Sequence, residues 1–313
     1  MAIPKPDWFD EDRVMVSTAP TCGISKSGDK LPKFDEEGNK IYKEDPETGE
    51  ETVAVDDELS EDIEALRNGK QTDTLHFIDS SDVSTRFGVP TYYDRRYHEA
   101  FKKELEKPMY KGFSSAPLGE LVEEGKITHR NGHGSAPKDL RDGEIPYIKV
   151  SDLRAGLVNI NPTNQVPPEF AQDMWGGEDS GLRPFDLISP ERASKNIGDF
   201  CVLLPGQTQI LITREVIVLR ATDEADFDQF YLLWAMTLEV VRKQWERVIF
   251  MQTNRQDVGD RFLEIEIPVA PNPNRAKEVS EAFRHYFTTL AEERSRLEDY
   301  LKENDHRFMM TGG

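Results

Sequence analysis

The chain has 313 residues, and its 39 Lys and Arg against 59 Asp and Glu give a formal net charge of −20. With 37% hydrophobic and 31% charged residues, it fits one large or two small soluble globular domains. The negative balance argues against indiscriminate nucleic-acid binding through bulk charge, although it leaves room for a locally basic site.

No apolar run approaches the roughly 18 residues that a membrane helix needs, and the start of the chain has no hydrophobic signal core. The two cysteines, Cys22 and Cys201, exclude a disulfide scaffold and a cysteine-rich zinc site. These features together predict a cytoplasmic protein.

The N-terminal part is the most acidic. Residues 1–110 sum to −11 and residues 111–313 to −9, and the acid is concentrated between Asp35 and Glu64. Few apolar residues lie there, so we expect a loop-rich or partly disordered extension without a core of its own. Helices are predicted from about residue 60 to 69 and over 95–107, with a short extended segment at 75–78.

The middle of the chain alternates β-like runs with turns. Strands are predicted over 145–150, 200–204, 209–219 and 262–269, and an amphipathic helix over 231–245. A long helix is predicted over 276–303, with an apolar seam of Val279, Phe283, Tyr286, Leu290, Leu297 and Tyr300. We expect Trp234 and Trp245 to lie in the core.

Catalytic signatures are missing from the sequence. It has no GxxxxGK[ST] or GxGxxG loop, no GxSxG elbow, no HExxH, and no Asn-Pro-Pro-Tyr or Asp-Pro-Pro-Tyr tetrapeptide. His129 and His133 are close in sequence, but a glycine-containing loop around them favours a polar role over a metal site. We therefore expect a protein that is not an enzyme.

Six ordered blocks carry a resemblance from residue 116 onward. They are APLGELV at 116–122 with GKI at 125–127, GEIPYIKVSDL at 143–153, DLIS at 186–189 with NIG at 196–198, REVIVLR at 214–220, FYLLW at 230–234 and IEIPVAP at 265–271. In this order they resemble the target-recognition domain of type I restriction-modification specificity subunits. A second set, CGISKSGDK at 22–30 and DDEL at 56–59, resembles the tail of an adenine methyltransferase subunit, with Ser25 in place of the usual Asp. PTYYDRRY at 90–97 resembles the lead-in segment of specificity subunits.

The resemblance implies an α+β fold, with a β-rich target-recognition domain at 111–273, a C-terminal helical arm at 274–313 and an acidic extension at 1–110. It implies sequence-specific binding of double-stranded DNA in a restriction-modification or anti-phage defence system. The partner would be an adenine DNA methyltransferase, which would carry S-adenosylmethionine, while this chain would need no cofactor and no metal. The apolar seam of the arm would either pack back on its own domain or pair with a second copy or with helices of the methyltransferase, since a lone exposed seam is unfavourable in water.

Three polar loops offer the groups that read bases and contact phosphates. The candidate DNA-binding residues are Lys149, Ser151, Arg154, Arg192, Ser194, Lys195, Asn196, Thr253, Asn254, Arg255 and Gln256.

Each candidate has a plainer alternative. Asp152 suits a turn better than a base contact, Asn254 and Gln256 fit ordinary loop residues equally well, and Arg242, Lys243 and Arg247 fit a solvated helix face or a phosphate-contacting one. Arg214 and Arg220 stand six positions apart in the strand-like run 214–220, so both could face the same side.

The rival interpretation is a protein-interaction or assembly subunit of a defence complex that does not read DNA bases, and the net charge favours it. A third possibility is an enzyme whose site has no familiar signature.

Overall fold

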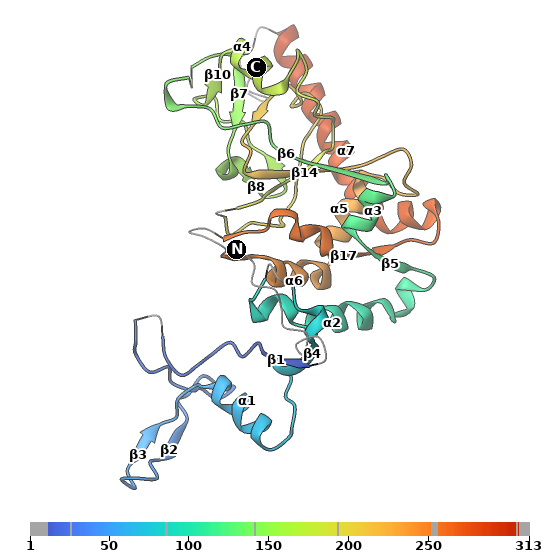
Figure 1. Ribbon diagram of the computed structural model, residues 1–313. Coiled ribbons are helices and arrows are strands. Elements are labelled where there is room, and N and C mark those ends of the chain that lie inside the picture. The colour runs from blue at the N-terminus through green and yellow to red at the C-terminus, as the bar shows by residue number, and fades with distance from the viewer. Residues whose placement is uncertain are drawn as a thin grey trace. The chain divides into compact units, whose positions relative to one another are not determined.

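The computed structural model describes residues 12–25, 27–84, 87–140, 142–192, 194–251, 256–304 and 306, with only the backbone of residues 251 and 256. It divides into two compact units, Met1–Arg96 (unit 1) and Tyr97–Gly313 (unit 2). Helices and sheets are mixed throughout, which confirms the predicted α+β class (Figure 1). The predicted division at residues 110 and 273 stays a prediction.

Unit 1 is built from short elements: β1 (Arg13–Ser17), β2 (Tyr42–Glu44), β3 (Glu51–Val53), α1 (Glu58–Arg67), β4 (Leu75–Asp79), and the 3-10 turns η2 (Ser80–Asp82) and η3 (Pro90–Tyr93). Strand β1 pairs with β4, and β2 pairs with β3, each in antiparallel register. The helix expected from about residue 60 and the extended segment expected at 75–78 are thus confirmed.

Polar contacts hold unit 1 together more than apolar packing does. In its described part, the buried hydrophobic side chains are Val16, Ala54, Leu75 and Ile78. The buried Asp62 carboxylate accepts hydrogen bonds from the hydroxyls of Ser17, Thr72 and Thr74 over 2.5–2.8 Å. Burial alone would raise the pKa of Asp62, but these three donors outweigh it and the pKa is lowered.

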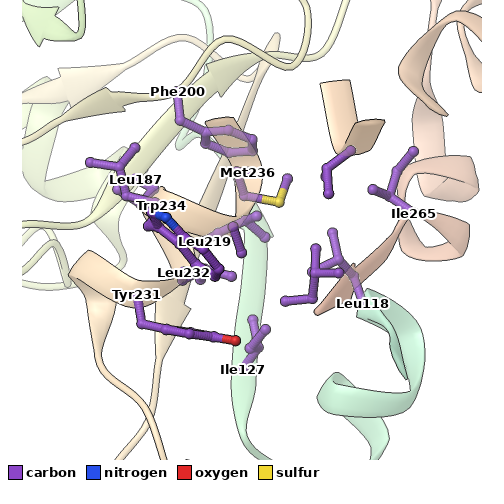
Figure 2. Packing of buried hydrophobic residues seen from close by; sticks show 14 of the residues in the cluster. Leu118, Ile127, Leu187, Phe200, Leu219, Tyr231, Leu232, Trp234, Met236 and Ile265 are labelled. Carbon is purple, nitrogen blue, oxygen red and sulfur yellow. The ribbon is translucent and has the colours of Figure 1, made fainter. Parts of the chain in front are cut away.

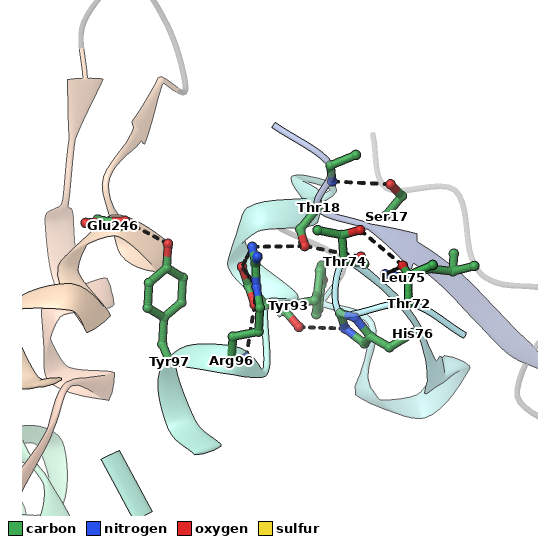
Figure 3. Close-up of polar contacts among 12 residues, drawn as sticks. Ser17, Thr18, Thr72, Thr74, Leu75, His76, Tyr93, Arg96, Tyr97 and Glu246 are labelled. Carbon is green, nitrogen blue, oxygen red and sulfur yellow. Dashed lines mark hydrogen bonds and ion pairs between the residues drawn. The ribbon is translucent and has the colours of Figure 1, made fainter. Parts of the chain in front are cut away.

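Two further contacts fix the end of unit 1. The His76 ring meets the Tyr93 carbonyl at 2.9 Å, and Arg96 reaches the Thr18 hydroxyl at 3.4 Å and the Asp94 carboxylate at 2.7 Å (Figure 3). Many large apolar side chains of this unit stay exposed instead: Met15, Ile24, Phe34, Ile41, Tyr42, Leu59 and Ile63. Between Asp35 and Glu64 the one buried hydrophobic side chain among the described residues is Ala54, so the apolar core of unit 1 comes mainly from β1 and β4.

Unit 2 contains the helices α2 (Arg96–Leu105), α3 (Leu118–Glu123), α4 (Pro168–Trp175), α5 (Gln229–Thr237), α6 (Glu239–Val248) and α7 (Pro273–Glu303). Its strands are β5 (Ser114–Pro117), β6 (Ile127–Asn131), β7 (Ile145–Ile148), β8 (Leu153–Arg154), β9 (Leu157–Val158), β10 (Gln165–Val166), β11 (Leu187–Pro190), β12 (Cys201–Val202), β13 (Leu211–Ile212), β14 (Val216–Ala221), β15 (Phe250–Met251), β16 (Gln256–Asp257) and β17 (Glu266–Val269). Four 3-10 turns join them: η4 (Pro108–Tyr110), η5 (Lys138–Leu140), η6 (Val150–Asp152) and η7 (Gly259–Glu264).

A six-stranded sheet with the order β6-β14-β11-β12-β9-β8 is the centre of unit 2. Most of its pairs are antiparallel, and β12 runs parallel to β9. A three-stranded sheet, β10-β7-β13, and the pairs β17-β5 and β15-β16 complete the β structure.

The main core lies between the sheet and the helices. Tyr231, Leu232 and Trp234 of α5 pack with Leu219 of β14 and Leu118 of α3 (Figure 2). Trp234 and Trp245 are 8% and 1% exposed, so both tryptophans are core residues as predicted. Tyr97 of α2 donates a hydrogen bond to Glu246 of α6 over 2.8 Å (Figure 3).

Two predicted elements are wrong in extent. The strand expected over 209–219 is two strands, β13 and β14, which belong to different sheets because a turn at Arg214 separates them. The helix expected over 231–245 is two helices, because Leu238 adopts an extended conformation between α5 and α6.

Smaller departures occur elsewhere. The predicted strand at 262–269 begins as η7 and is extended only from Glu266, so the residues before it do not alternate between two faces. The predicted strands at 145–150 and 200–204 are shorter than expected, β7 and β12. The helices expected over 95–107 and 276–303 are confirmed as α2 and α7.

Candidate nucleic-acid interface

The first polar loop leaves β7 and turns through η6 into β8. The Asp152 carboxylate accepts the Lys149 backbone N–H over 2.8 Å, so Asp152 shapes the turn as its sequence context favoured. Arg154 is exposed and its Nε donates to the Ser151 carbonyl over 2.7 Å. Ser151 is exposed and Lys149 is half-buried. The loop therefore presents one fixed guanidinium and one hydroxyl.

The second polar loop follows β11 and includes Arg192, Ser194, Lys195 and Asn196. The Ser194 hydroxyl accepts the Asn196 backbone N–H over 3.1 Å, and both Lys195 and Asn196 are exposed. Arg192 forms an isolated antiparallel bridge with Asp257. The second loop thus lies beside the base of the third, although more than fifty residues separate them in sequence.

The third polar loop joins β15 to β16. Gln252, Thr253, Asn254 and Arg255 lie outside the described residues, as does the side chain of Gln256, so their predicted base contacts stay predictions. The described base of this hairpin pairs in register, with Phe250 opposite Asp257.

A buried arginine clamps that base. Arg261 is 6% exposed and donates to the Val248 carbonyl over 2.8 Å and to the Asp257 carboxylate over 3.0 Å. Its guanidinium also lies over the Phe250 ring, 4.0 Å from the centroid. Both strands of the hairpin are therefore fixed where they leave the domain.

A buried carboxyl stands where the second and third loops meet. Glu191 accepts a hydrogen bond from the Asn131 amide over 2.7 Å, and its own carbonyl accepts the Val258 N–H over 3.1 Å. Burial raises the pKa of Glu191, while the charge of Arg192 lowers it and the nearby Asp257 raises it. This residue ties β6 to the loops and was not singled out from the sequence.

The first and second loops meet in a pocket of about 260 Å³, whose lining includes Arg154 and Asn196. Arg242 of α6 and Thr237 at the end of α5 line the same pocket. The sequence placed Arg242 only on a helix face, because nothing in its neighbourhood indicates which loop that face meets.

Other sequence expectations end differently. Arg214 is exposed in the turn before β14, whereas Arg220 on the strand pairs with the buried Asp186, so the two arginines do not share a strand face. The loop expected around His129 is largely β6, where the His129 ring lies against Phe262 with centroids 5.3 Å apart.

Two searches of the described residues give negative results. Over the described ranges, no three His, Cys, Asp or Glu side chains are grouped as metal ligands would be. Among the helices that the structure describes, none combines the length and the apolar character that crossing a membrane requires.

Comparisons with known proteins give partial likenesses of structure only. No family model matches the chain, and no curated protein matches it. The structure is similar to a type I restriction-modification S subunit from M. genitalium, with a TM-score of 0.38, 14% identity, and 62% of this chain covering 42% of that one.

It is also similar to the HsdS subunit from Thermoanaerobacter tengcongensis, with a TM-score of 0.36, 17% identity, and 65% of this chain covering 48% of that one. The type IIG restriction endonuclease BpuSI gives a TM-score of 0.45 and 10% identity, with 72% of this chain covering 33% of that one. The chain thus matches less than half the length of each of these three structures.

Proposed function

We propose that this chain is a sequence-specific DNA-binding specificity subunit that directs a partner adenine DNA methyltransferase. The observation that carries the proposal is the meeting of the first two polar loops with each other and with the described base of the third, although the three come from distant parts of the sequence. Arg192 bridges to Asp257 at the base of the third loop, and Asn196 shares a pocket with Arg154 of the first. Guanidinium and amide groups gathered in this way are the groups that contact phosphates and base edges.

The ordered sequence blocks from residue 116 onward support the same function, because they resemble the target-recognition domain of type I specificity subunits. Two of the blocks coincide with elements around the loops: block 143–153 contains β7 and η6 and ends on the first residue of β8, and block 186–189 overlaps β11.

The mechanism follows from a division of labour. Lys149, Ser151, Arg154, Arg192, Ser194, Lys195 and Asn196 would position the chain on the duplex through phosphates and base edges. Thr253, Asn254, Arg255 and Gln256 would supply the densest set of base-reading groups. The partner, which carries S-adenosylmethionine, would flip the adenine and methylate it, so this chain itself needs no cofactor.

The C-terminal arm would serve assembly. The predicted seam on α7 divides into two parts: Val279, Phe283 and Leu290 pack against the main core of unit 2, while Tyr286, Leu297 and Tyr300 are 57%, 41% and 53% exposed. The exposed part would pair with a second copy or with helices of the methyltransferase. Self-pairing would place two recognition domains at a fixed spacing and make the target a split palindrome.

Selection from a random pool of duplexes tests the DNA-reading function. The purified chain is expected to enrich one sequence motif, and methylome sequencing with and without the gene should show that adenine methylation at this motif depends on the chain. The proposal would be contradicted if the chain enriched no motif, or if adenine methylation were unchanged without the gene. Methyl transfer to DNA by the chain alone would contradict its role as a subunit without catalysis.

A second candidate function is an assembly subunit that never reads bases. The observation favouring it is unit 1, where 23 acidic and 12 basic residues accompany several exposed apolar side chains, among them Phe34 and Tyr42. Such a surface suits a protein partner better than DNA. Enrichment of a motif by selection would rule this candidate out as the whole function of the chain.

A further inference from the structure

The pocket between the first two polar loops has a mixed lining. Leu153, Phe200, Cys201 and Met236 give it apolar walls, and Arg154, Asn196, Asp199, Thr237 and Arg242 give it polar groups. Its charged groups are thus two guanidiniums and one carboxylate. In a chain with a net charge of −20, this is a locally positive hollow.

Helix α6 carries three cations, and the structure separates them. Lys243 pairs with Glu239 one turn earlier over 2.8 Å, and Arg247 pairs with Glu264 over 3.1 Å. Arg242 alone of the three lines the pocket. The two interpretations of this helix face therefore apply to different residues, because Lys243 belongs to the solvated face and Arg242 does not.

The backbone of the second loop fixes the position of Arg242. Its guanidinium lies 2.9 Å from the Asp199 carboxylate and 3.5 Å from the Ile197 carbonyl. Gly198 adopts a positive φ of 82°, and a Cβ there would lie 2.5 Å from Arg242 Nη1 and from the Trp245 ring. A residue without a side chain is therefore required at 198 for the guanidinium to keep these two contacts.

Arg154 supplies the second guanidinium of the pocket lining. Its Nε is held by the Ser151 carbonyl, and in the described part of the chain no partner is bonded to its two terminal nitrogens. The turn that follows, Ala155 and Gly156, has φ values of 52° and 74°, which reverses the chain from β8 into β9. Each guanidinium is thus held by contacts with its own loop, and each keeps further N–H groups that can donate to a ligand.

We infer that this pocket binds one phosphate group, supplied by the backbone of the duplex that the neighbouring loops read. Two guanidiniums and the Asn196 amide match the donors that a phosphodiester accepts, and partial neutralisation of Arg242 by Asp199 sets its geometry before binding. A phosphate contact carries no sequence information, so the pocket fixes register while the third loop reads bases. The inference rests on the proposed function and adds to it a phosphate site with Arg242 as a positioning residue.

Titrations of two labelled duplexes, the selected motif and a scrambled control, between 50 and 200 mM salt test the pocket. The variants R154A and R242A are expected to weaken binding to both duplexes by about tenfold and to reduce the slope of log affinity against log salt by about 1. K243A, one residue away on the same helix, is the matched control and should leave both quantities unchanged. Unchanged affinity in R154A and R242A, or a loss confined to the motif duplex, would overturn the inference.

A variant that is expected to strengthen DNA binding separates loss of the site from loss of the fold. D199N removes the one carboxylate among the described residues that line the pocket, and it should tighten binding to both duplexes. The gain should exceed any change in E239Q, which removes an exposed acid from helix α6. A damaged fold would weaken binding instead. No gain in D199N relative to E239Q would count against the pocket.

Competition identifies the source of the phosphate. Adenosine monophosphate or inorganic phosphate at millimolar concentration should displace DNA from the wild type only weakly. If neither duplex binds the wild type, the proposed function fails, and calorimetry with adenosine monophosphate then decides the pocket alone. If adenosine monophosphate binds the wild type but not R242A, the ligand of the pocket is a free nucleotide and the inferred DNA source is wrong. If adenosine monophosphate does not bind the wild type, the pocket is not a phosphate site.

Discussion

Arg220 of β14 forms a two-point hydrogen-bonded ion pair with Asp186, with Nε to Oδ1 at 2.7 Å and Nη2 to Oδ2 at 2.6 Å. The Asp186 side chain is 1% exposed and that of Arg220 is 21% exposed. Arg220 also donates to the Gly181 carbonyl over 2.8 Å, so the pair holds the loop before β11 against the sheet.

We predict that R220A lowers the free energy of unfolding by about 3–5 kcal/mol, because it removes the cation that is hydrogen-bonded to the buried Asp186 carboxylate. Urea denaturation measures this change. R296A breaks the exposed pair of Arg296 and Glu293 and is the matched control, with a change below about 1 kcal/mol. Equal effects of the two substitutions would contradict the prediction.

His133 makes stability depend on pH. Burial, together with the charge of Arg130, lowers its pKa to about 4, against a hydrogen bond to the Ser180 carbonyl that raises it. Nδ1 accepts the Ile212 N–H over 3.2 Å, so the neutral ring carries its proton on Nε2. Protonation at Nδ1 would remove that acceptor.

Because the folded pKa lies below the usual value of about 6.5, the unfolded chain binds the extra proton first. The stability contributed by His133 is therefore complete above about pH 6.5 and is lost as the pH falls toward 4, by up to about 3 kcal/mol. Urea denaturation between pH 4 and 6.5 measures this loss. The difference in free energy of unfolding between wild type and H133Q isolates the contribution of His133, because Glu191, whose pKa is also shifted, is present in both proteins. A difference that stays constant between pH 4 and 6.5 would disprove this assignment.

Gly198 should be intolerant of any side chain. G198A is expected to lower the free energy of unfolding by about 1–3 kcal/mol from backbone strain alone, and further because its Cβ would collide with Arg242 and Trp245. Gly125 has a φ of 73° with open space around it, so G125A measures the strain without the collision. The melting temperature of G198A should be well below that of G125A. The opposite order would show that the neighbours of Gly198 move aside and relieve the crowding.

Alanine substitution of Asn254 or Arg255 tests base reading by the third loop. Each change should cost about 1–3 kcal/mol of binding free energy on the selected motif and relax specificity at one base pair. Competition binding against single-base variants of the motif measures both effects. R296A lies on α7 and serves as the control. If affinity and sequence preference survive both alanines, this loop is not the reader.

The exposed part of the α7 seam should govern assembly without affecting the fold. Replacing Leu297 and Tyr300 with serine is expected to abolish pairing while changing the free energy of unfolding by less than about 0.5 kcal/mol. Light scattering, with and without the methyltransferase, gives the mass of each assembly.

The contrasting control is F283S, because Phe283 packs on the core of its own unit and its loss should lower stability. This placement also makes Phe283 and Leu290 poor sites for testing pairing, since charges there would damage the fold. Masses that are the same for wild type and the Leu297 and Tyr300 variant would argue against an assembly role for the arm.

Local patterns predicted those elements whose identity depends on their own residues. Helix α7 was expected from its apolar spacing and ends at Glu303 as predicted. The strand expected over 209–219 failed because β-branched residues favour extended structure without specifying a partner: Leu211 pairs with Tyr147, whereas Leu219 pairs with Leu187 and His129. The break at Leu238 carries no glycine or proline, so propensity could not reveal it.

The candidate site was predictable in composition but not in arrangement. Arg154 and Asn196 were recognisable as polar loop residues, yet their shared pocket depends on how β8, β9 and β12 pair. The sequence placed Arg242 on a helix face without showing which loop it meets, and it did not single out Glu191, because each acquires its role from a segment distant in sequence, Asp199 and Val258 among them.

The clamp at the base of the β15-β16 hairpin has a consequence for which parts of the sequence can vary. Arg261, Phe250 and Asp257 secure both strands from outside the four residues between Met251 and Gln256. These contacts use no side chain from those four positions, so a change of sequence there would leave the clamp itself in place. Evolution, or an engineer grafting a foreign tetrapeptide, can rewrite that segment of the chain while the rest of the domain keeps its sequence.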